Sequence, residues 1–181
     1  MTFRPPSGGL LRMTVLKTDR LILRGPSKDD VDALFAVYGD PRVMRFWSEP
    51  PHADRSVTRA MVMRHVQSFE RAPLYFVIER NGCAIGRAGV HERDEIGFIL
   101  GFDHWREGLM TEALQALVAY YFEDLRFSQL TADADPCNEA SVATLLKAGF
   151  VQTGEEKNTF CVNGDWSDSV YFTLKPDQRA A

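Results

Sequence analysis

The segment from residue 95 to residue 113 has the composition of an anion-binding site. It reads Glu-Ile-Gly-Phe-Ile-Leu-Gly-Phe-Asp-His-Trp-Arg-Glu-Gly-Leu-Met-Thr-Glu-Ala, which predicts a strand over 95–100, a polar loop and the beginning of a helix. The first turn of a helix carries backbone N–H groups without intrahelical partners, and the helix dipole adds positive partial charge. The segment therefore predicts a phosphate site at the helix start. The same pattern also fits a segment that binds nothing. In that case Gly108 only relieves the strain of a tight turn, and Trp105 anchors the segment in the core.

The turn residues and the hydrophobic periodicity predict the elements that must position this segment. Ser27 and Asp30 indicate a capping box before an apolar stripe, and Asn81-Gly82 and Asn163-Gly164 are preferred hairpin turns. Hairpins require antiparallel strand pairs, whereas strand–helix–strand crossovers require parallel ones. We therefore expect an α/β (α+β) fold with one mixed sheet of about seven strands. The predicted elements are a strand at 21–23, a helix from 27 that Gly39-Asp40-Pro41 ends, a helix from about 54–56, strands at 74–79, 83–91 and 95–100, a helix to about 125, a strand at 129–134, a helix at 138–148, and a last hairpin that ends with 170–174.

A single domain is expected, because 181 residues are typical of one domain and neither a repeat nor a linker interrupts residues 18–174. Residues 1–13 contain several prolines and glycines and are expected to form a disordered leader. The domain should then span 14–176, and 177–181 should form a flexible tail.

Composition and charge exclude several classes of protein. The net charge of −4 provides no basic surface for a nucleic acid, and the apolar runs are far shorter than the roughly 20 residues that span a bilayer. The three cysteines, Cys83, Cys137 and Cys161, lack zinc-ligand spacing and cannot all pair with one another. They are expected to be reduced thiols in a cytoplasmic protein, and no metal is expected.

Three segments carry a resemblance to a known family. They are Thr-Asp-Arg-Leu-Ile-Leu-Arg at 18–24, the run 95–113, and Asn-Glu-Ala-Ser-Val-Ala-Thr-Leu-Leu-Lys-Ala-Gly-Phe at 138–150. In this order they resemble the first strand, the acetyl-CoA motif and the Asn-x-x-Ser…Lys-x-Gly-Phe segment of the GNAT superfamily of N-acetyltransferases. The resemblance is strongest to its RimJ/RimL-like (ribosomal-protein N-acetyltransferase-like) branch, and it extends from residue 18 to about 174.

The resemblance implies a mostly antiparallel sheet with helices on both faces and a splayed parallel pair formed by strands 95–100 and 129–134. Acetyl-CoA would lie in the opening of this pair as a cosubstrate. Its pantetheine would follow the first strand, its pyrophosphate would lie on the amides that begin the next helix, and an N–H near Phe98 or Ile99 would polarise the thioester carbonyl. The implied cofactor-binding residues are Phe98, Ile99, Leu100, Arg106, Glu107, Gly108, Leu109, Met110, Thr111 and Asn138.

Two residues depart from the pattern of the family. Arg106 stands where the family usually has glycine, and Met110 stands where it usually has glycine or alanine. Small residues at these positions would let the backbone approach the pyrophosphate closely. Arg106 could instead point outward or contact phosphate, and the flexible Met110 could be absorbed by the core.

Direct transfer requires a neutral amine, so a base or a water relay must remove a proton from an ammonium group. Glu95 opens the strand beside the expected thioester and is the first choice for this base, with His91 as the rival. Ser141 is the candidate acid near the sulfur, and Tyr171 is an alternative acid, although a tyrosine in a late strand usually belongs to the core. Asn138 would hold the cofactor, or it only caps its helix. Cys137 has no activating partner in the sequence and is rejected as a nucleophile.

The function implied by this resemblance is N-acetyl transfer from acetyl-CoA to a primary amine by direct attack in a ternary complex. The acceptor would be a protein N-terminus or a small-molecule amine, neither nucleic acid nor membrane is expected as a partner, and a homodimer stays open. The alternative is a non-catalytic acyl-CoA-binding or regulatory module that retains the fold, which Arg106 and Met110 favour.

Overall fold

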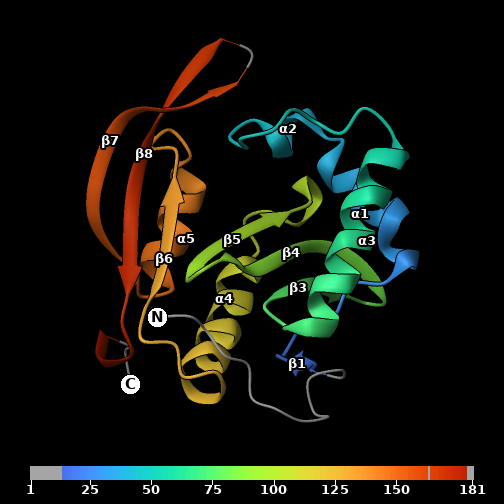
Figure 1. The fold of residues 1–181 in the computed structure, drawn as a ribbon, viewed down its shortest axis with the longest axis horizontal. Coiled ribbons are helices and arrows are strands. Elements are labelled where there is room, and N and C mark those ends of the chain that lie inside the picture. Colours follow the sequence, from blue (N-terminus) through green and yellow to red (C-terminus); the bar gives the residue numbers. More distant parts are fainter. Residues whose placement is uncertain (1–13, 163, 179–181) are drawn as a thin grey trace.

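The computed structural model describes residues 14–162 and 164–178, in which eight strands form one mixed sheet with helices on both faces (Figure 1). The strands follow one another across the sheet in the order β1-β2-β3-β4-β5-β6-β8-β7. All neighbours are antiparallel except β5 and β6, which are parallel. The strands are β1 (Leu16–Lys17), β2 (Ile22–Arg24), β3 (Tyr75–Arg80), β4 (Cys83–Glu92), β5 (Glu95–Leu100), β6 (Leu130–Ala134), β7 (Val151–Val162) and β8 (Asp165–Leu174).

The helices form two layers on opposite faces of the sheet. Strand β3 shows why, since successive side chains of a strand point to opposite faces. Phe76 and Ile78 belong to the larger apolar core under α4, whereas Val77 belongs to a second core under α1, α2 and α3. The helices are α1 (Val31–Tyr38), α2 (Pro41–Met44), α3 (Arg55–Arg71), α4 (Leu109–Ala119) and α5 (Glu139–Lys147). Short 3-10 turns lie at Lys28–Asp30, Phe102–His104 and Pro176–Gln178.

Local signals placed most of the elements correctly. The fold class is confirmed, Ser27 and Asp30 form the expected capping box, and Asn81 and Gly82 have the positive φ values, 51° and 79°, of the predicted hairpin turn. Asn163 lies outside the described residues, while Gly164 beside it has a φ of 93°. The expected leader at 1–13 and the last three residues of the expected tail, 179–181, also lie outside them.

Three elements differ from the predicted ones. The chain forms an eighth strand, β1, because Leu16 and Lys17 pair with β2. Gly39-Asp40-Pro41 ends α1 as predicted, but Asp40 then caps the short helix α2, in which Pro41 occupies the first turn. The helix predicted to reach about residue 125 is regular only to Ala119 and closes with a π-helical turn over Tyr120–Asp124.

Strands β5 and β6 diverge along most of their length. Their register contains a single pair, Glu95 with Thr131, at the amino-terminal ends of both strands. Because the strands are parallel, their carboxyl ends lie at the open end of this splayed pair, and each leads into a helix there, α4 after β5 and α5 after β6. The splayed pair predicted from the resemblance is therefore confirmed.

Candidate active site

The amino-terminal end of α4 provides a ready site for an anion. The first regular bond of this helix runs from the Glu112 N–H to the Gly108 carbonyl, at 3.1 Å, so the N–H groups of residues 109–111 point out of the helix end. Gly108 has a φ of 75°, and a Cβ added to it would meet only the Arg20 guanidinium, at 3.7 Å. An open cradle of backbone N–H groups fits a pyrophosphate.

The two side chains that depart from the family pattern, Arg106 and Met110, both lie beside this cradle. Met110 is buried in the main core together with Leu109, so both residues leave only their backbone at the helix start. Arg106 is exposed and has a φ of 64°, a left-handed conformation that favours glycine. Trp105, which was considered as a core anchor, is instead 37% exposed, and its indole N–H donates to the Leu100 carbonyl at 2.7 Å.

Replacement of Arg106 by glycine should stabilise the protein by about 0.5–1 kcal/mol. A left-handed conformation costs a non-glycine residue about 1–2 kcal/mol, and the added freedom of glycine in the unfolded chain offsets part of that gain. Urea unfolding of Arg106→Gly and of a control, Arg106→Ala, measures the effect. Alanine keeps the strain and loses only the charge, so an equal gain in both variants would show that charge and not backbone strain is responsible.

A clamp from the beginning of the chain holds α4 in place. Thr18 and Arg20 donate to the carboxylate of Glu112 through the Thr18 hydroxyl, the Arg20 N–H and the Arg20 guanidinium. Arg20 also donates to the Glu107 carbonyl at 2.9 Å, and Arg80 binds the Glu107 carboxylate at 2.8 Å. Sequence analysis matched Thr18, Arg20 and Glu112 to family motifs but did not pair them, because about 90 residues separate the two ends of the clamp.

The clamp gives a pH-dependent prediction. Burial acts to raise the pKa of Glu112, but the hydrogen bonds from Thr18 and Arg20 outweigh it and hold this pKa below its usual value. A carboxylate with a lowered folded-state pKa contributes stability above its unfolded pKa of about 4.3 and loses it as the pH falls through the folded value. Glu112→Gln should therefore cost about 1–3 kcal/mol at pH 7 and less near pH 3.

Urea unfolding at the two pH values measures this cost. Glu139→Gln is the matched control, because Glu139 is an exposed glutamate in the first turn of α5 and should cost at most about 1 kcal/mol at pH 7. A Glu112→Gln cost that is the same at both pH values would contradict the role given to the ionised carboxylate.

The closed end of the splayed pair carries the candidate base. Glu95 and His91 lie together there, with 3.3 Å between His91 Nε2 and Glu95 Oε1, and both side chains are a little under half exposed. Burial raises the pKa of Glu95 above its usual value, His91 opposes this, and the carboxylates of Asp133, Glu92 and Asp94 add to the rise. A glutamate with a raised pKa is a better proton acceptor near neutral pH than an ordinary one.

Glu95 opens onto a groove of about 610 Å³ formed by β6, β7 and β8. Tyr171 lines this groove opposite Asp133, and its hydroxyl donates to the Glu156 carboxylate at 3.1 Å. The interpretation of Tyr171 as a core residue is therefore wrong. The alternation of β8 could have shown this, because the flanking Val170 and Phe172 are the residues that point into the core.

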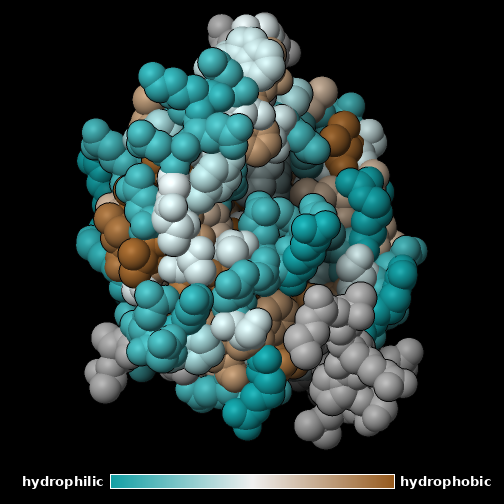
Figure 2. All heavy atoms as spheres, turned by 60° about the vertical axis from the view of Figure 1, so that its left-hand side comes forward, coloured by the Kyte–Doolittle hydropathy of each residue, from teal (hydrophilic) through white to brown (hydrophobic). Residues whose placement is uncertain are grey.

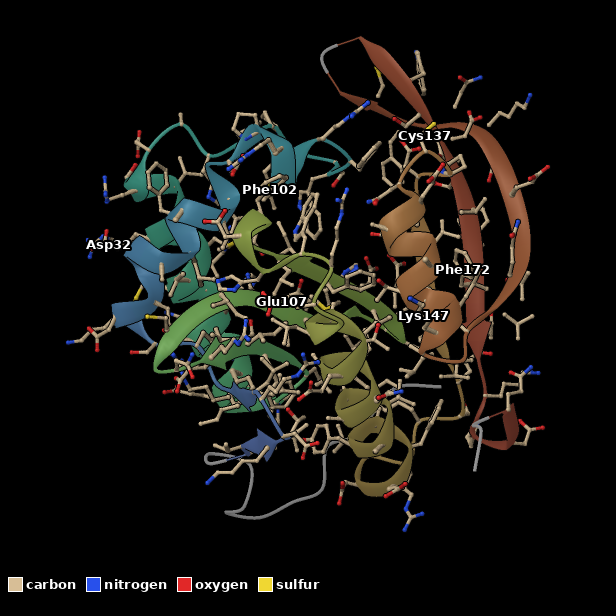
Figure 3. All side chains as sticks on the ribbon, turned by 180° about the vertical axis from the view of Figure 1, so that it is seen from behind. Asp32, Phe102, Glu107, Cys137, Lys147 and Phe172 are labelled. Atoms are coloured by element: carbon tan, nitrogen blue, oxygen red, sulfur yellow. The ribbon has the colours of Figure 1, made fainter. Side chains whose placement is uncertain are left out.

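Asn138 and Ser141 lie at the start of α5, the helix that follows β6 at the open end of the splayed pair. The Asn138 side chain caps α5 by accepting the Ser141 N–H at 3.2 Å, so its capping role is real whether or not it also contacts a cofactor. Helix α5 packs beside α4, on the face opposite to α1–α3. Figure 3 shows this helix between the labelled Cys137 and Lys147, with Phe102 and Glu107 on the loop that leads to α4. The structure thus places Glu95 at the closed end of the splayed pair and Ser141 in the first turn of the helix that follows its open end.

The face of the molecule on the side of β7 and β8 is mainly hydrophilic, with small separate apolar areas (Figure 2). Cys83, Cys137 and Cys161 are all free and exposed. Over residues 14–162 and 164–178, no group of three or more potential ligands is arranged to hold a metal. None of the helices in these ranges is both long enough and apolar enough to cross a membrane.

Comparison with known proteins shows the family of this chain. Residues 20–151 match the family described as the acetyltransferase (GNAT) domain. An uncharacterized N-acetyltransferase of Bacillus subtilis, YoaA, is 33% identical over 90% of this chain and 97% of its own length. The chain therefore belongs to the GNAT family of N-acetyltransferases.

Solved structures show the same fold. The acetyltransferase of the GNAT family from Bacillus anthracis superposes with a TM-score of 0.83 at 22% identity, over 91% of this chain and 99% of its own. RimL, a ribosomal L7/L12 alpha-N-protein acetyltransferase in complex with coenzyme A, gives a TM-score of 0.81 at 20% identity, over 92% and 100% of the two chains. The resemblance to the RimJ/RimL-like branch is confirmed at the level of the fold.

Proposed function

We propose that this enzyme transfers the acetyl group of acetyl-CoA to a primary amine by direct attack in a ternary complex. One observation carries the proposal. The opening between β5 and β6 has an anion cradle, the start of α4, at one end and a carboxylate with a raised pKa, Glu95, at the other. Strand β5 connects the two over six residues, roughly 20 Å.

The residues of this opening fit acetyl-CoA as the cosubstrate. The backbone N–H groups at 106–111 would hold the pyrophosphate, and the backbone of Phe98, Ile99 and Leu100 would face the pantetheine where β5 lacks a partner in β6. Asn138 at the start of α5 would contact the cofactor from the other side. When bound, acetyl-CoA supplies an acetyl group already activated as a thioester.

Glu95 would take the proton from the incoming ammonium group, directly or through a water. His91, 3.3 Å away, would hold the carboxylate in position, and it is also the rival for the role of base. A β5 N–H near Phe98 or Ile99 would donate to the carbonyl oxygen as negative charge develops on it. Ser141 remains the candidate acid for the departing thiolate, with Tyr171 as the alternative.

The groove beside Glu95 suits a cationic acceptor. Three carboxylates, Glu95, Asp133 and Glu156, line it, and none of its described lining residues is a lysine or an arginine. Such a groove attracts an ammonium group before it loses its proton. Both a protein N-terminus, as in the name of RimL, and a small-molecule amine fit this chemistry. Free, exposed cysteines are usual in the cytoplasm, where we expect the enzyme to work.

Calorimetric titration with acetyl-CoA and coenzyme A, followed by a thiol-release assay over a panel of amines and peptide N-termini, tests the proposal. We expect binding of both ligands and acetyl-CoA-dependent thiol release with at least one acceptor. Binding without turnover on any acceptor would instead favour a non-catalytic acyl-CoA-binding module. The burial of Met110 and the outward place of Arg106 weigh against that alternative, because neither side chain fills the cradle.

A further inference from the structure

Arg87 on β4 is among the largest fully buried side chains in the described part of the protein, with 1% of its surface exposed. It points to the side of the sheet that α1 and α3 cover, where one of its terminal nitrogens lies 3.3 Å from the Tyr38 hydroxyl and 3.3 Å from the Met61 sulfur. Its guanidinium carbon lies 4.3 Å from the centre of the Tyr75 ring. The other two nitrogens, Nε and the second terminal nitrogen, have no hydrogen-bond partner among the described residues.

Among the described residues, the charge of Arg87 also lacks a carboxylate. No ion pair to it exists within residues 14–162 and 164–178, and the positions outside these ranges contain no aspartate or glutamate. A buried guanidinium without an anion is strongly unfavourable, so proteins rarely keep one unless something binds to it. A hydrophobic side chain would serve the packing of this core better.

A second residue with an unpartnered nitrogen lies beside the same tyrosine. The Nδ1 atom of His65 is buried without a hydrogen bond to any described residue, and the His65 ring lies 5.8 Å from that of Tyr75. Tyr38 and Tyr75 both lie against the Arg87 guanidinium, the first through its hydroxyl and the second through its ring. Arg87, His65, Tyr38 and Tyr75 therefore form a polar cluster, here named the Arg87 cluster, within an otherwise apolar layer.

The Arg87 cluster adjoins the candidate active site. The Tyr75 hydroxyl lies 3.7 Å, and His91 Nε2 lies 3.4 Å, from the point that a Cβ on Gly97 would occupy. The Tyr75 ring thus neighbours both groups, with the Arg87 guanidinium carbon 4.3 Å and the centre of the His91 ring 6.5 Å from its own centre. One of the side chains over Arg87 is Met61, whose flexible thioether can change rotamer.

We infer that Arg87 is a specificity-determining residue that binds an oxyanion, a carboxylate or a phosphate, of the acceptor whose amine lies at Glu95. The inference rests on the proposed acetyl transfer and names the class of acceptor, an amine that also carries an anionic group. Arg87 pairs with Ile99, four residues along β5 from Glu95, which corresponds to roughly 13 Å of strand. Amine and anion are therefore separated by several bonds, as in an ω-amino acid and not as in an α-amino acid.

Two matched pairs of acceptors test this inference. 6-Aminohexanoate is compared with pentylamine, and 4-aminobutanoate with propylamine, so that each pair differs only in the carboxylate. For the wild type we expect kcat/KM to favour the longer amino acid over its alkylamine by roughly 10- to 100-fold, the effect of one charge-assisted hydrogen-bonded pair. In Arg87→Met this ratio should fall to about 1, whereas Arg59→Met, which removes an exposed arginine of α3, should keep it.

Thermal unfolding provides a second readout that needs no turnover. Hexanoate should raise the Tm of the wild type, because a ligand that binds the folded state stabilises it, and should not raise that of Arg87→Met. Arg87→Met itself should unfold at a temperature no lower than the wild type, because it removes an unpaired buried charge. A purely structural arginine would give the opposite result, with a lower Tm and equal losses for both members of each pair.

The possible failures are distinguishable. Absence of turnover with all four acceptors and with the amine panel would contradict the proposed transfer, and the hexanoate shift would still decide whether the Arg87 cluster binds a carboxylate. Turnover without a carboxylate preference in the wild type, together with no hexanoate shift, would overturn the inference and indicate that buried water satisfies Arg87.

Discussion

Glu95→Gln should lower kcat by about 10²–10⁴-fold, the usual contribution of a positioned acid or base. The amide is close to the carboxylate in shape but cannot accept a proton from an ammonium group. The affinity for acetyl-CoA should stay nearly unchanged, because the proposed contacts of β5 with the cofactor are made by its backbone. Steady-state kinetics and calorimetric titration of the same preparations measure the two quantities.

The pH dependence of the rate distinguishes Glu95 from its neighbours. Burial and nearby carboxylates raise the pKa of Glu95, so the wild-type rate should fall as the pH drops through that raised value and the base becomes protonated. In Glu95→Gln this acid limb should flatten. Glu70→Gln is the matched control, since Glu70 is an exposed carboxylate of α3 that does not contribute to the raised pKa of Glu95 and should change kcat little. A small rate loss with an unchanged profile would assign the proton transfer to His91 or to bulk solvent, and His91→Gln separates these two outcomes.

Gly108→Trp should reduce the affinity for coenzyme A by about 100-fold or more. The structure leaves open space next to Gly108, where a side chain would meet only the Arg20 guanidinium, so the variant can fold while its indole occupies the anion cradle. Loss of two charge-assisted hydrogen bonds to a pyrophosphate accounts for a change of this size. Calorimetric titration measures the affinity, and circular dichroism confirms the fold.

Gly108→Ala is the control for this variant. Alanine imposes the same strain at a φ of 75° but places only a methyl group in the cradle, so it should lose stability and keep most of the affinity. Equal affinities of the tryptophan variant and the wild type would place the pyrophosphate elsewhere and contradict the assignment of residues 106–111.

Features that depend on neighbouring residues could be predicted from the sequence. The bounds of β5, the Asn81-Gly82 turn and the cap that Asn138 provides for α5 all follow from local rules of conformation. The position of Glu95 beside the opening also followed, because the family resemblance supplied the pairing of two strands far apart in the chain.

Features that depend on distant contacts could not be predicted in this way. The buried Arg87 reads in the sequence as one polar residue in a strand, and only the packing of α1 and α3 over β4 shows that its charge is unpaired. The clamp of Glu112 by Thr18 and Arg20 was invisible for the same reason. The sequence also left undecided whether the Met110 side chain is buried, since a residue in the first turn of a helix can point either to the core or to the ligand.

The clamp on Glu112 has a consequence for biosynthesis. Thr18 and Arg20 leave the ribosome more than 90 residues ahead of the glutamate that holds them. At about 5–20 residues per second, the first strands wait roughly 5–20 s before their partner on α4 has been synthesised. The start of the chain is therefore exposed to proteases and chaperones throughout this interval, and the cofactor cradle is completed only after translation has passed α4.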